Sequence, residues 1–250
     1  MNPLPRNTPA RTGVADHRHG HPRRQEHDVR IGVIGAGNIG GNLTRAFTRL
    51  GHEVRVANSR GPQTLADLAA ETGASAVTAP EAARDADLVV VTVPEKNVPD
   101  LAGALDGAAD GTVVVDTGNY YPRERDGRID AIEGGTPETA WVAQQLDPAG
   151  RLRWVKAFNG IQAEHLLNAA RPAGDPERRG LPLAGDDPAA KAVVADLLFT
   201  MGFDAVDAGT LAESWRQQPG TPVYGAELDA DGIARALGEA QRERPAAFTA

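Results

Sequence analysis

The sequence predicts an α/β fold, a doubly wound and mostly parallel sheet that ends in a short C-terminal helical arm. Two observations support this prediction. From Val29 to Asp207, short runs rich in β-branched residues alternate with segments whose apolar residues recur at helical spacing. After about Gly209 this alternation stops. We therefore expect one domain over residues 29–207 and an arm over residues 208–250.

The first strand leads into a glycine-rich turn and a helix. Val29–Ile34 is the β-branched run, and apolar residues recur at helical spacing from Leu43 to Leu50. Between them lies G-x-G-x-x-G, written here Gly35-Ala36-Gly37-Asn38-Ile39-Gly40. In such a turn the first glycine permits a tight bend, the second lets a pyrophosphate approach the backbone, and the third lets the helix pack on the strand. This context predicts a Rossmann-type dinucleotide site, whose phosphates meet the helix amides around Asn38 and Ile39.

The second strand, Val54–Ala57, ends in Asn58-Ser59-Arg60-Gly61-Pro62, where many dinucleotide-binding folds carry an acidic residue. Asn58 lies 21 positions beyond Gly37, the distance at which a ribose contact is expected. A carboxylate there would repel a 2′-phosphate, whereas amide, hydroxyl and guanidinium groups bind one. The stretch predicts NADP(H) rather than NAD(H) as the cofactor; the alternative is that Arg60 is an ordinary loop cation.

Six further strands and five helical stretches complete the predicted sheet. The strands are expected at Ala74–Val77, Asp87–Val93, Gly111–Asp116, Arg153–Phe158, Leu181–Ala184 and Asp204–Asp207. The helices are expected near 62–72, 97–106, 137–147, 161–170 and 188–201. The strands at 87–93 and 111–116 are apolar enough to be central strands that are covered on both faces.

Ligands of such sheets bind beyond the carboxyl ends of the strands. The loops there are Thr92–Glu95, the stretch 116–122 with Asn119, which we count among the cofactor contacts, and Lys156–Ile161. They hold aromatic and amide side chains but no evident nucleophile and base. This suits hydride transfer between two redox cofactors better than oxidation of an alcohol. Lys156 is either the partner of a ligand phosphate or carboxylate, or a solvent-exposed cation.

The stretch Glu213–Gly225 combines Trp215, Arg216, two glutamines and Tyr224. It is too polar for a core. We expect it either to close over the acceptor or, with a slight preference, to contact a second subunit.

The chain carries, in this order, IGVIGAGNIGGNL, VANSRGP, VTVPEKNV, VVDTGNYYP, WVKAFNGI, LPLAGDD and AESWRQQPGTPVYG. The series runs from about Val29 to Tyr224 and resembles the NADPH-dependent F420 reductase family, also called F420-dependent NADP oxidoreductases. The related cytosolic domain of membrane ferric reductases shares it. The resemblance implies an oxidoreductase that transfers a hydride between the nicotinamide of NADP(H) and C5 of a deazaflavin, coenzyme F420, as co-substrate.

The resemblance also implies roles for individual residues. Ser59 and Arg60 would hold the 2′-phosphate, and Gly35–Gly40 the pyrophosphate. The residues that would line the nicotinamide ribose are Thr92, Val93 and Pro94. Those that would form the deazaflavin wall are Ala157, Phe158, Asn159 and Ile161. This last loop departs from the archetypal pattern of a His and an Ile-Pro pair, so another flavin-type acceptor remains an alternative.

Two other functions remain open. One is an NADPH-dependent reductase of a small imine or carbonyl, or of a ferric or flavin substrate. Imine reductases of this kind build their substrate site from a long helical C-terminal domain, for which residues 208–250 are too few. The other is a non-catalytic module that senses NADPH. His165 is the one candidate proton donor to the reduced acceptor; the alternative is a partly buried helix histidine without a chemical role.

Composition sets the remaining expectations. The 250-residue chain has a formal net charge of −8 and no cysteine. It has no apolar run near the roughly 20 residues that a membrane span needs. These features argue against nucleic-acid partners, disulfides and thiolate metal sites, and they favour a cytoplasmic protein, which we expect to be a homodimer. Residues 1–28, rich in Pro, Arg and His, are expected to be disordered. His17, His19 and His21 would bind a metal only if that tail were ordered, and we expect no metal.

Overall fold

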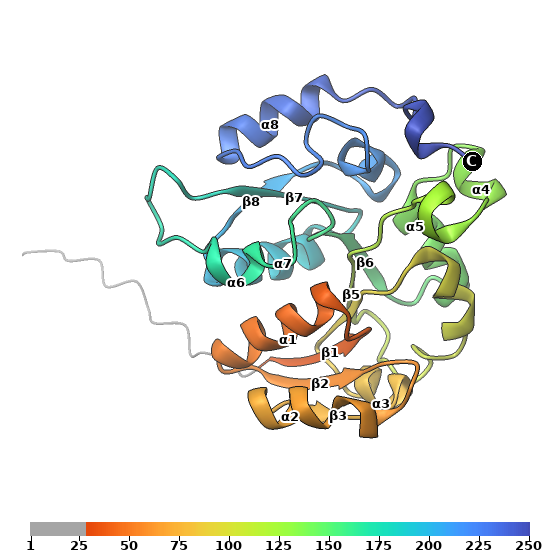
Figure 1. Ribbon diagram of the computed structural model, residues 1–250, viewed down its shortest axis with the longest axis vertical. Helices are drawn as coiled ribbons and strands as arrows, with labels where there is room; N and C mark the ends of the chain where they lie inside the picture. Colours follow the sequence, from red (N-terminus) through yellow and green to blue (C-terminus); the bar gives the residue numbers. More distant parts are fainter. Residues whose placement is uncertain (1–28) are drawn as a thin grey trace, which may run out of the picture.

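The computed structural model describes residues 29–250, which form an eight-stranded sheet with helices on both faces (Figure 1). The strand order is β3-β2-β1-β4-β5-β6-β7-β8. The strands are β1 (Arg30–Ile34), β2 (Glu53–Ala57), β3 (Ser75–Ala76), β4 (Leu88–Val91), β5 (Val113–Asp116), β6 (Arg153–Lys156), β7 (Gly180–Gly185) and β8 (Asp204–Asp207). Neighbouring strands run parallel except for the antiparallel pair β6 and β7. The predicted doubly wound, mostly parallel fold is confirmed.

The expectations for residues 1–28, disorder and a metal site at His17, His19 and His21, concern a segment outside the described residues. Within residues 29–250, the structure contains no helix that is long and apolar enough to cross a membrane.

The helices follow the predicted order. They are α1 (Asn38–Arg49), η1 (Pro62–Leu65), α2 (Ala66–Thr72), α3 (Ala79–Ala83), η2 (Glu95–Leu101), η3 (Pro122–Asp126), α4 (Asp130–Glu133), α5 (Glu138–Leu146), α6 (His165–Asn168), α7 (Pro188–Thr200), η4 (Leu211–Gln217), α8 (Ala230–Glu239) and η5 (Ala246–Phe248).

Two of the expected helices differ from the prediction. The helix expected near 97–106 is the tighter η2, because Pro99 lacks the amide that an α-helix needs at this position. The helix expected near 161–170 is reduced to the single turn α6. Residues 162–164 instead begin turns with hydrogen bonds between residues i and i+3, as in the bond from the His165 amide to the Gln162 carbonyl (3.0 Å).

The core lies on both faces of the central strands. Every side chain of β4 is buried, and so is every side chain of β5. Alternate residues therefore supply two separate apolar layers. One layer joins Val90 and Val115 to Phe47 of α1 and to α7. The other joins Val89 and Val114 to α3 and α5.

Most of β7 lies beyond the end of its neighbour β6. Only Gly185 and Ala184 pair with β6, whereas Gly180–Leu183 pair with β8 alone. Because β7 is antiparallel to β6, its first residues extend beyond the carboxyl end of β6. In Figure 1, β7 and β8 accordingly lie with α8 in an upper lobe above α1.

The arm packs on this lobe and on β6. Ile233, Ala236 and Leu237 of α8 form a third apolar cluster with Ala184 and Val223. The expectation that the stretch Glu213–Gly225 is too polar for a core is wrong, because Ser214, Gln217 and Gln218 are buried. Gln217 Nε2 donates to the Lys156 carbonyl and Gln218 Oε1 accepts from Arg244, whereas Ser214 Oγ and Gln217 Oε1 have no hydrogen-bond partner among the described residues.

Candidate functional site

The glycine turn joins β1 to α1 at the reversal of strand order between β1 and β4. Gly35 has φ of +108°, and a Cβ on Gly40 would lie 1.8 Å from the Gly35 carbonyl oxygen, so both positions require glycine. A Cβ on Gly37 would meet nothing within 4 Å. Packing within the described chain therefore does not explain Gly37, which leaves the space above it free for a ligand.

The start of α1 is suited to an anion. Its N-cap, Gly37, supplies no side-chain cap, and the first turn contains no acidic residue. Asn38 and Ile39 open the helix, so their amides and the helix dipole face this space without a carboxylate. Unpaired amides at a helix N-terminus bind phosphate groups readily.

The end of β2 forms a compact turn in which Asn58 is a structural residue. Its Oδ1 accepts the Arg60 amide (3.0 Å), and its Nδ2 donates to the Thr64 hydroxyl (2.9 Å). The Ser59 hydroxyl and the Arg60 guanidinium are exposed and have no partner among residues 29–250. The two groups that would bind a 2′-phosphate are thus unengaged, while Asn58 holds the turn that presents them.

A cavity of about 620 Å³ connects the turn at Gly37 with Arg60. It is lined by Ala36, Gly37, Asn38, Gly41, Asn42, Arg45, Arg60, Thr64, Leu65, Asp67, Leu68, Glu71, Ala163 and Glu164. Arg45 is neutralised there by Glu71, through bonds of 2.7 and 2.6 Å. Arg60 is therefore the guanidinium in this cavity that remains available for a phosphate.

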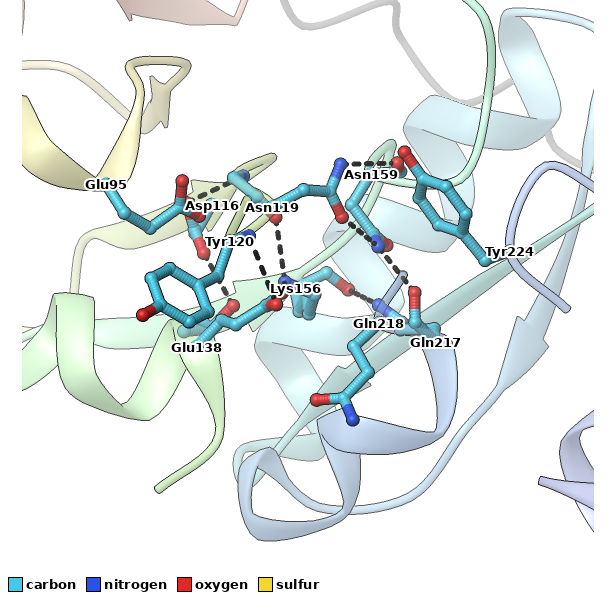
Figure 2. A network of polar contacts seen from close by, with 12 residues as sticks. Glu95, Asp116, Asn119, Tyr120, Glu138, Lys156, Asn159, Gln217, Gln218 and Tyr224 are labelled. Atoms are coloured by element: carbon cyan, nitrogen blue, oxygen red, sulfur yellow. Dashed lines mark hydrogen bonds and ion pairs between the residues drawn. The ribbon is translucent and has the colours of Figure 1, made fainter. Parts of the chain in front are cut away.

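The nicotinamide end of such a site lies at the carboxyl ends of β4, β5 and β6. Thr92, Val93 and Pro94 follow β4 and are partly buried beside the glycine turn, where the Thr92 carbonyl lies close to Gly35. The loops after β5 and β6 are tied together by two amides. Asn119 Nδ2 donates to the Asn159 carbonyl (2.8 Å), and Asn159 Nδ2 donates to Asn119 Oδ1 (3.0 Å) (Figure 2).

The arm closes over these loops. Asn159 Nδ2 also donates to the Gln217 carbonyl (2.6 Å), and Gln217 Nε2 donates to the Lys156 carbonyl (3.1 Å). The four residues of the expected deazaflavin wall are consequently buried: Ala157, Phe158, Asn159 and Ile161. In this structure they offer little surface to a ligand.

Lys156 is neither a ligand partner nor a solvent-exposed cation, the two alternatives that the sequence left open. It is 1% exposed, and its Nζ donates to Glu138 Oε2 and to the Gly118 carbonyl, both at 2.9 Å (Figure 2). Burial alone would lower the pKa of Lys156, but the carboxylates of Glu138 and Asp116 outweigh it and raise that pKa. The lysine is therefore a buried structural cation.

Glu138 of α5 is the centre of a larger cluster. Its Oε1 accepts the Tyr120 amide (3.1 Å) and Arg244 Nη2 (2.7 Å), in addition to the Lys156 bond at Oε2. Burial alone would raise the pKa of the Glu138 carboxyl, but Lys156 and Arg244 together lower it. Glu138 is thus an ionised carboxylate between two cations.

A second buried carboxyl, Glu95, directly follows Pro94. Its Oε2 accepts from Arg125 Nη2 (2.7 Å), and its Oε1 has no hydrogen-bond partner among the described residues. Burial, followed by the charges of Glu138 and Asp116, raises the pKa of Glu95 well above its ordinary value. Neither Glu95 nor Glu138 was predicted as a site residue from the sequence. For Glu95 a signal was present, since it is a carboxyl at the end of a strand-end loop on the ligand edge of the sheet.

Two tyrosines bring the β5 loop and the arm into contact. The hydroxyl groups of Tyr121 and Tyr224 are hydrogen-bonded, and the Arg125 guanidinium lies 5.1 Å from the centre of the Tyr121 ring. Burial and the Tyr224 hydroxyl raise the pKa of Tyr121, which keeps its proton. The pair is a proton-bearing group next to the Asn119 loop.

His165 begins α6, away from this cluster. Its Nδ1 lies 2.9 Å from Arg179 Nη1, and Arg179 also binds Glu227 (2.8 Å). Nδ1 also lies 3.2 Å from Glu227 Oε1, an oxygen that only accepts, so its two contacts require opposite tautomers of the ring. His165 lines a small gap with Ile161 and Gly225, so its role as a proton donor stays a prediction.

Comparison with known proteins gives a consistent result. The model of the family described as "NADP oxidoreductase coenzyme F420-dependent" matches residues 30–120, which span β1 to the loop after β5. The solved structure of SMa0349 from Sinorhizobium meliloti is 33% identical, with a TM-score of 0.66, over 79% of this chain and 94% of that one.

Two further proteins are similar. The structure of a candidate F420-dependent NADP reductase from Arthrobacter sp. FB24 is 23% identical, with a TM-score of 0.58, over 73% of this chain and 86% of that one, and shows the fold. Metalloreductase STEAP3 of Rattus norvegicus is 29% identical over 185 residues, 74% of this chain and 35% of that protein. The chain spans less than half the length of the curated relatives it matches.

Proposed function

The chain belongs to the family of coenzyme F420-dependent NADP oxidoreductases, and on that premise we propose that it exchanges a hydride between NADP(H) and a deazaflavin of the F420 type. Such a reaction moves a hydride between the nicotinamide C4 and C5 of the deazaflavin ring, while a proton enters or leaves at a ring nitrogen. The protein has to bind both ligands, align them at about 3–3.5 Å and exclude water.

The observation that carries the cofactor assignment is the unengaged Arg60 guanidinium at the end of β2. Beside it lie the Ser59 hydroxyl and a turn that contains no carboxylate at the ribose position. Together with the open space above Gly37, this arrangement fits a 2′-phosphate and a pyrophosphate at the two ends of one cavity. These features support NADP(H) over NAD(H).

The acceptor assignment rests on the family and on the kind of groups at the site. The β5 and β6 loops are joined by the amide pair of Asn119 and Asn159, of which the partly buried Asn119 is the member that can hydrogen-bond to a planar ring. The ionisable groups behind that pair are engaged with one another and are buried. Such a site positions a redox ring without supplying a strong base to it.

A second candidate function has one observation in its favour. The hydrogen-bonded hydroxyls of Tyr121 and Tyr224 retain a proton beside the Asn119 loop. Reduction of a small carbonyl needs such a donor, because the oxygen must be protonated as the hydride arrives at carbon. This would make the protein an NADPH-dependent carbonyl reductase.

The deciding experiment is an acceptor panel. The purified protein is given NADPH and, separately, oxidised F420, FMN, FAD, a ferric chelate and a set of small ketones and imines, and loss of NADPH absorbance is followed. Turnover confined to F420 supports the first proposal. Turnover of ketones that is lost in Tyr224→Phe supports the second. No turnover with intact NADPH binding contradicts both and favours an NADPH sensor.

We also propose a homodimer, at a surface other than the one first expected. The stretch Glu213–Gly225 is engaged with β6 of its own chain. Instead, α7 exposes Val193 and Phe199, which are 43% and 53% exposed, on its outer side. Light scattering on the native protein and on Phe199→Glu tests this, since a dimer through α7 becomes a monomer in the variant.

A further inference from the structure

The last ten residues, Gln241–Ala250, cross the molecule as an extended strap that ends beside α4 and α5 (Figure 1). The strap is fastened at several points. The Arg123 Nε donates to the Thr249 carbonyl (3.0 Å), the Ala250 amide donates to Glu133 (2.9 Å), and the Phe248 ring lies 6.3 Å from that of Tyr121. All these partners follow β5.

One strap residue reaches the interior. Arg244 is only 9% exposed in its side chain, while Arg242 in the same strap is exposed. Arg244 Nη2 donates to Glu138 Oε1 (2.7 Å) and to Gln218 Oε1 (2.9 Å), and the guanidinium lies 5.3 Å from the centre of the Tyr120 ring. A charge from the strap is thus placed inside the cluster around Glu138.

That cluster holds the loop after β5 at two points. Glu138 Oε1 accepts the Tyr120 amide, and Lys156 Nζ, which is bound to Glu138, donates to the Gly118 carbonyl (Figure 2). The residue between these two points is Asn119, whose side chain pairs with Asn159 at the expected nicotinamide end of the site. Arg244 is therefore connected to Asn119 through one carboxylate and two backbone groups.

Arg244 also sets the charge balance at Glu138. Without it, the buried Glu138 carboxylate would be bonded to one cation, Lys156. Of the two present donors to Oε1, the Tyr120 amide would remain and the Arg244 guanidinium would be lost. A shift of the loop by a fraction of an ångström would follow, because buried charge networks rearrange when one member is lost. Hydride transfer is sensitive to displacements of this size.

We infer that Arg244 is a positioning residue, by which the C-terminal strap sets the geometry of the β5 loop against the nicotinamide. The inference rests on the proposed function for its catalytic consequence. Its structural part, the control of the loop by the strap, stands independently of the acceptor.

The first test needs no acceptor. Amide hydrogen exchange of peptides covering residues 117–124 is measured in the full-length protein saturated with NADPH, for the native protein, Arg244→Gln, Arg244→Lys and the matched control Arg242→Gln. We expect exchange in Arg244→Gln to be about tenfold faster, since the Arg244 guanidinium no longer holds Glu138 Oε1, the acceptor of the Tyr120 amide, in place. Arg244→Lys restores part of the protection, and Arg242→Gln resembles the native protein. Equal exchange in all four proteins overturns the inference.

The second test uses whichever acceptor the panel identifies. With NADPH deuterated at both C4 positions, Arg244→Gln should lower kcat about tenfold and increase the isotope effect, while the KM for NADPH changes less than about twofold. A fall in kcat that simply follows a loss of folded protein overturns the inference. If Arg244→Gln does not fold, Arg244→Lys decides by the same readouts. If no acceptor is found, the proposed function fails, and the exchange experiment still decides the role of the strap.

Discussion

The two ends of the proposed site are built in different ways. The NADP(H) end consists of a glycine turn and a five-residue stretch after β2, both formed by neighbours in sequence, with its binding groups unengaged. The acceptor end is formed by segments 18 to 106 residues apart that meet at Glu138, where the charged groups are buried and bonded to one another. The first end is ready for a ligand, whereas the second is a rigid frame that a ligand must fit. The predictions below test that contrast, from the largest expected effect to the smallest.

Glu138→Gln should have the largest effect on stability. It leaves Lys156 and Arg244 buried without their shared carboxylate, and we expect a loss of about 3–5 kcal/mol in the free energy of unfolding. Asp87→Asn, which breaks the exposed pair with Arg30, should cost less than about 1 kcal/mol. Chemical denaturation measures both. Similar losses for the two variants would contradict the description of the acceptor end around Glu138 as a rigid frame.

The two glycines of the turn should separate folding from binding. Gly40→Ala places a methyl group against the Gly35 carbonyl, and we expect a loss of about 3 kcal/mol in stability. Gly37→Ala meets no neighbour, so its folding should be unaffected while NADPH binding weakens about tenfold or more. Thermal unfolding and NADPH fluorescence titration measure the two effects. Undiminished NADPH binding in Gly37→Ala would mean that the pyrophosphate lies elsewhere.

Arg60→Ala should weaken NADPH binding by about 1.5–3 kcal/mol and leave NADH binding nearly unchanged, because the guanidinium would contact only the 2′-phosphate. Arg49→Ala, at the far end of α1, is the control. Equal losses for NADPH and NADH would show that Arg60 does not distinguish the two nucleotides.

Glu95 should give the smallest effect, visible as a pH dependence. Its pKa is raised in the folded protein, so above the ordinary value of 4.5 the unfolded chain releases a proton that the folded protein retains. The favourable contribution is full below that value and is lost as the pH rises toward the folded-state pKa. Between pH 5 and pH 8, the native protein should therefore lose more stability than Glu95→Gln does. The exposed Glu124→Gln serves as the control, and parallel stability curves for all three proteins would contradict the prediction.

The sequence predicts the fold well because its signals are local. Valine runs mark β4 and β5, which are buried on both faces, and the glycine pattern marks the turn into α1. One local rule fails at η2, where Pro99 explains the tighter helix. Of the residues predicted for the NADP(H) end, Gly37, Asn38 and Arg60 line one cavity, because the turns that present them are also formed by neighbours in sequence.

The acceptor end was not predictable in this way. The charge of Lys156 gives no indication of its partner 18 residues away, and Arg244 gives none of a carboxylate 106 residues away. The polar composition of Glu213–Gly225 indicated exposure, yet Gln217 of that stretch pairs inside the molecule with the Lys156 carbonyl of β6 and with the side-chain amide of Asn159. Such partners are selected by the completed fold rather than by spacing along the chain.

Glu138 has a consequence for how relatives of this chain can diverge. It serves Lys156, Arg244 and the Tyr120 amide at once, so replacing Glu138 leaves two buried cations without their shared carboxylate, and replacing either cation alone changes the charge balance of the buried cluster. Single substitutions at these positions should be removed by selection, while joint replacement by a neutral set should survive. An alignment of relatives is therefore expected to show Glu138, Lys156 and Arg244 retained together or lost together, a correlation that the surface pair of Arg30 and Asp87 should lack.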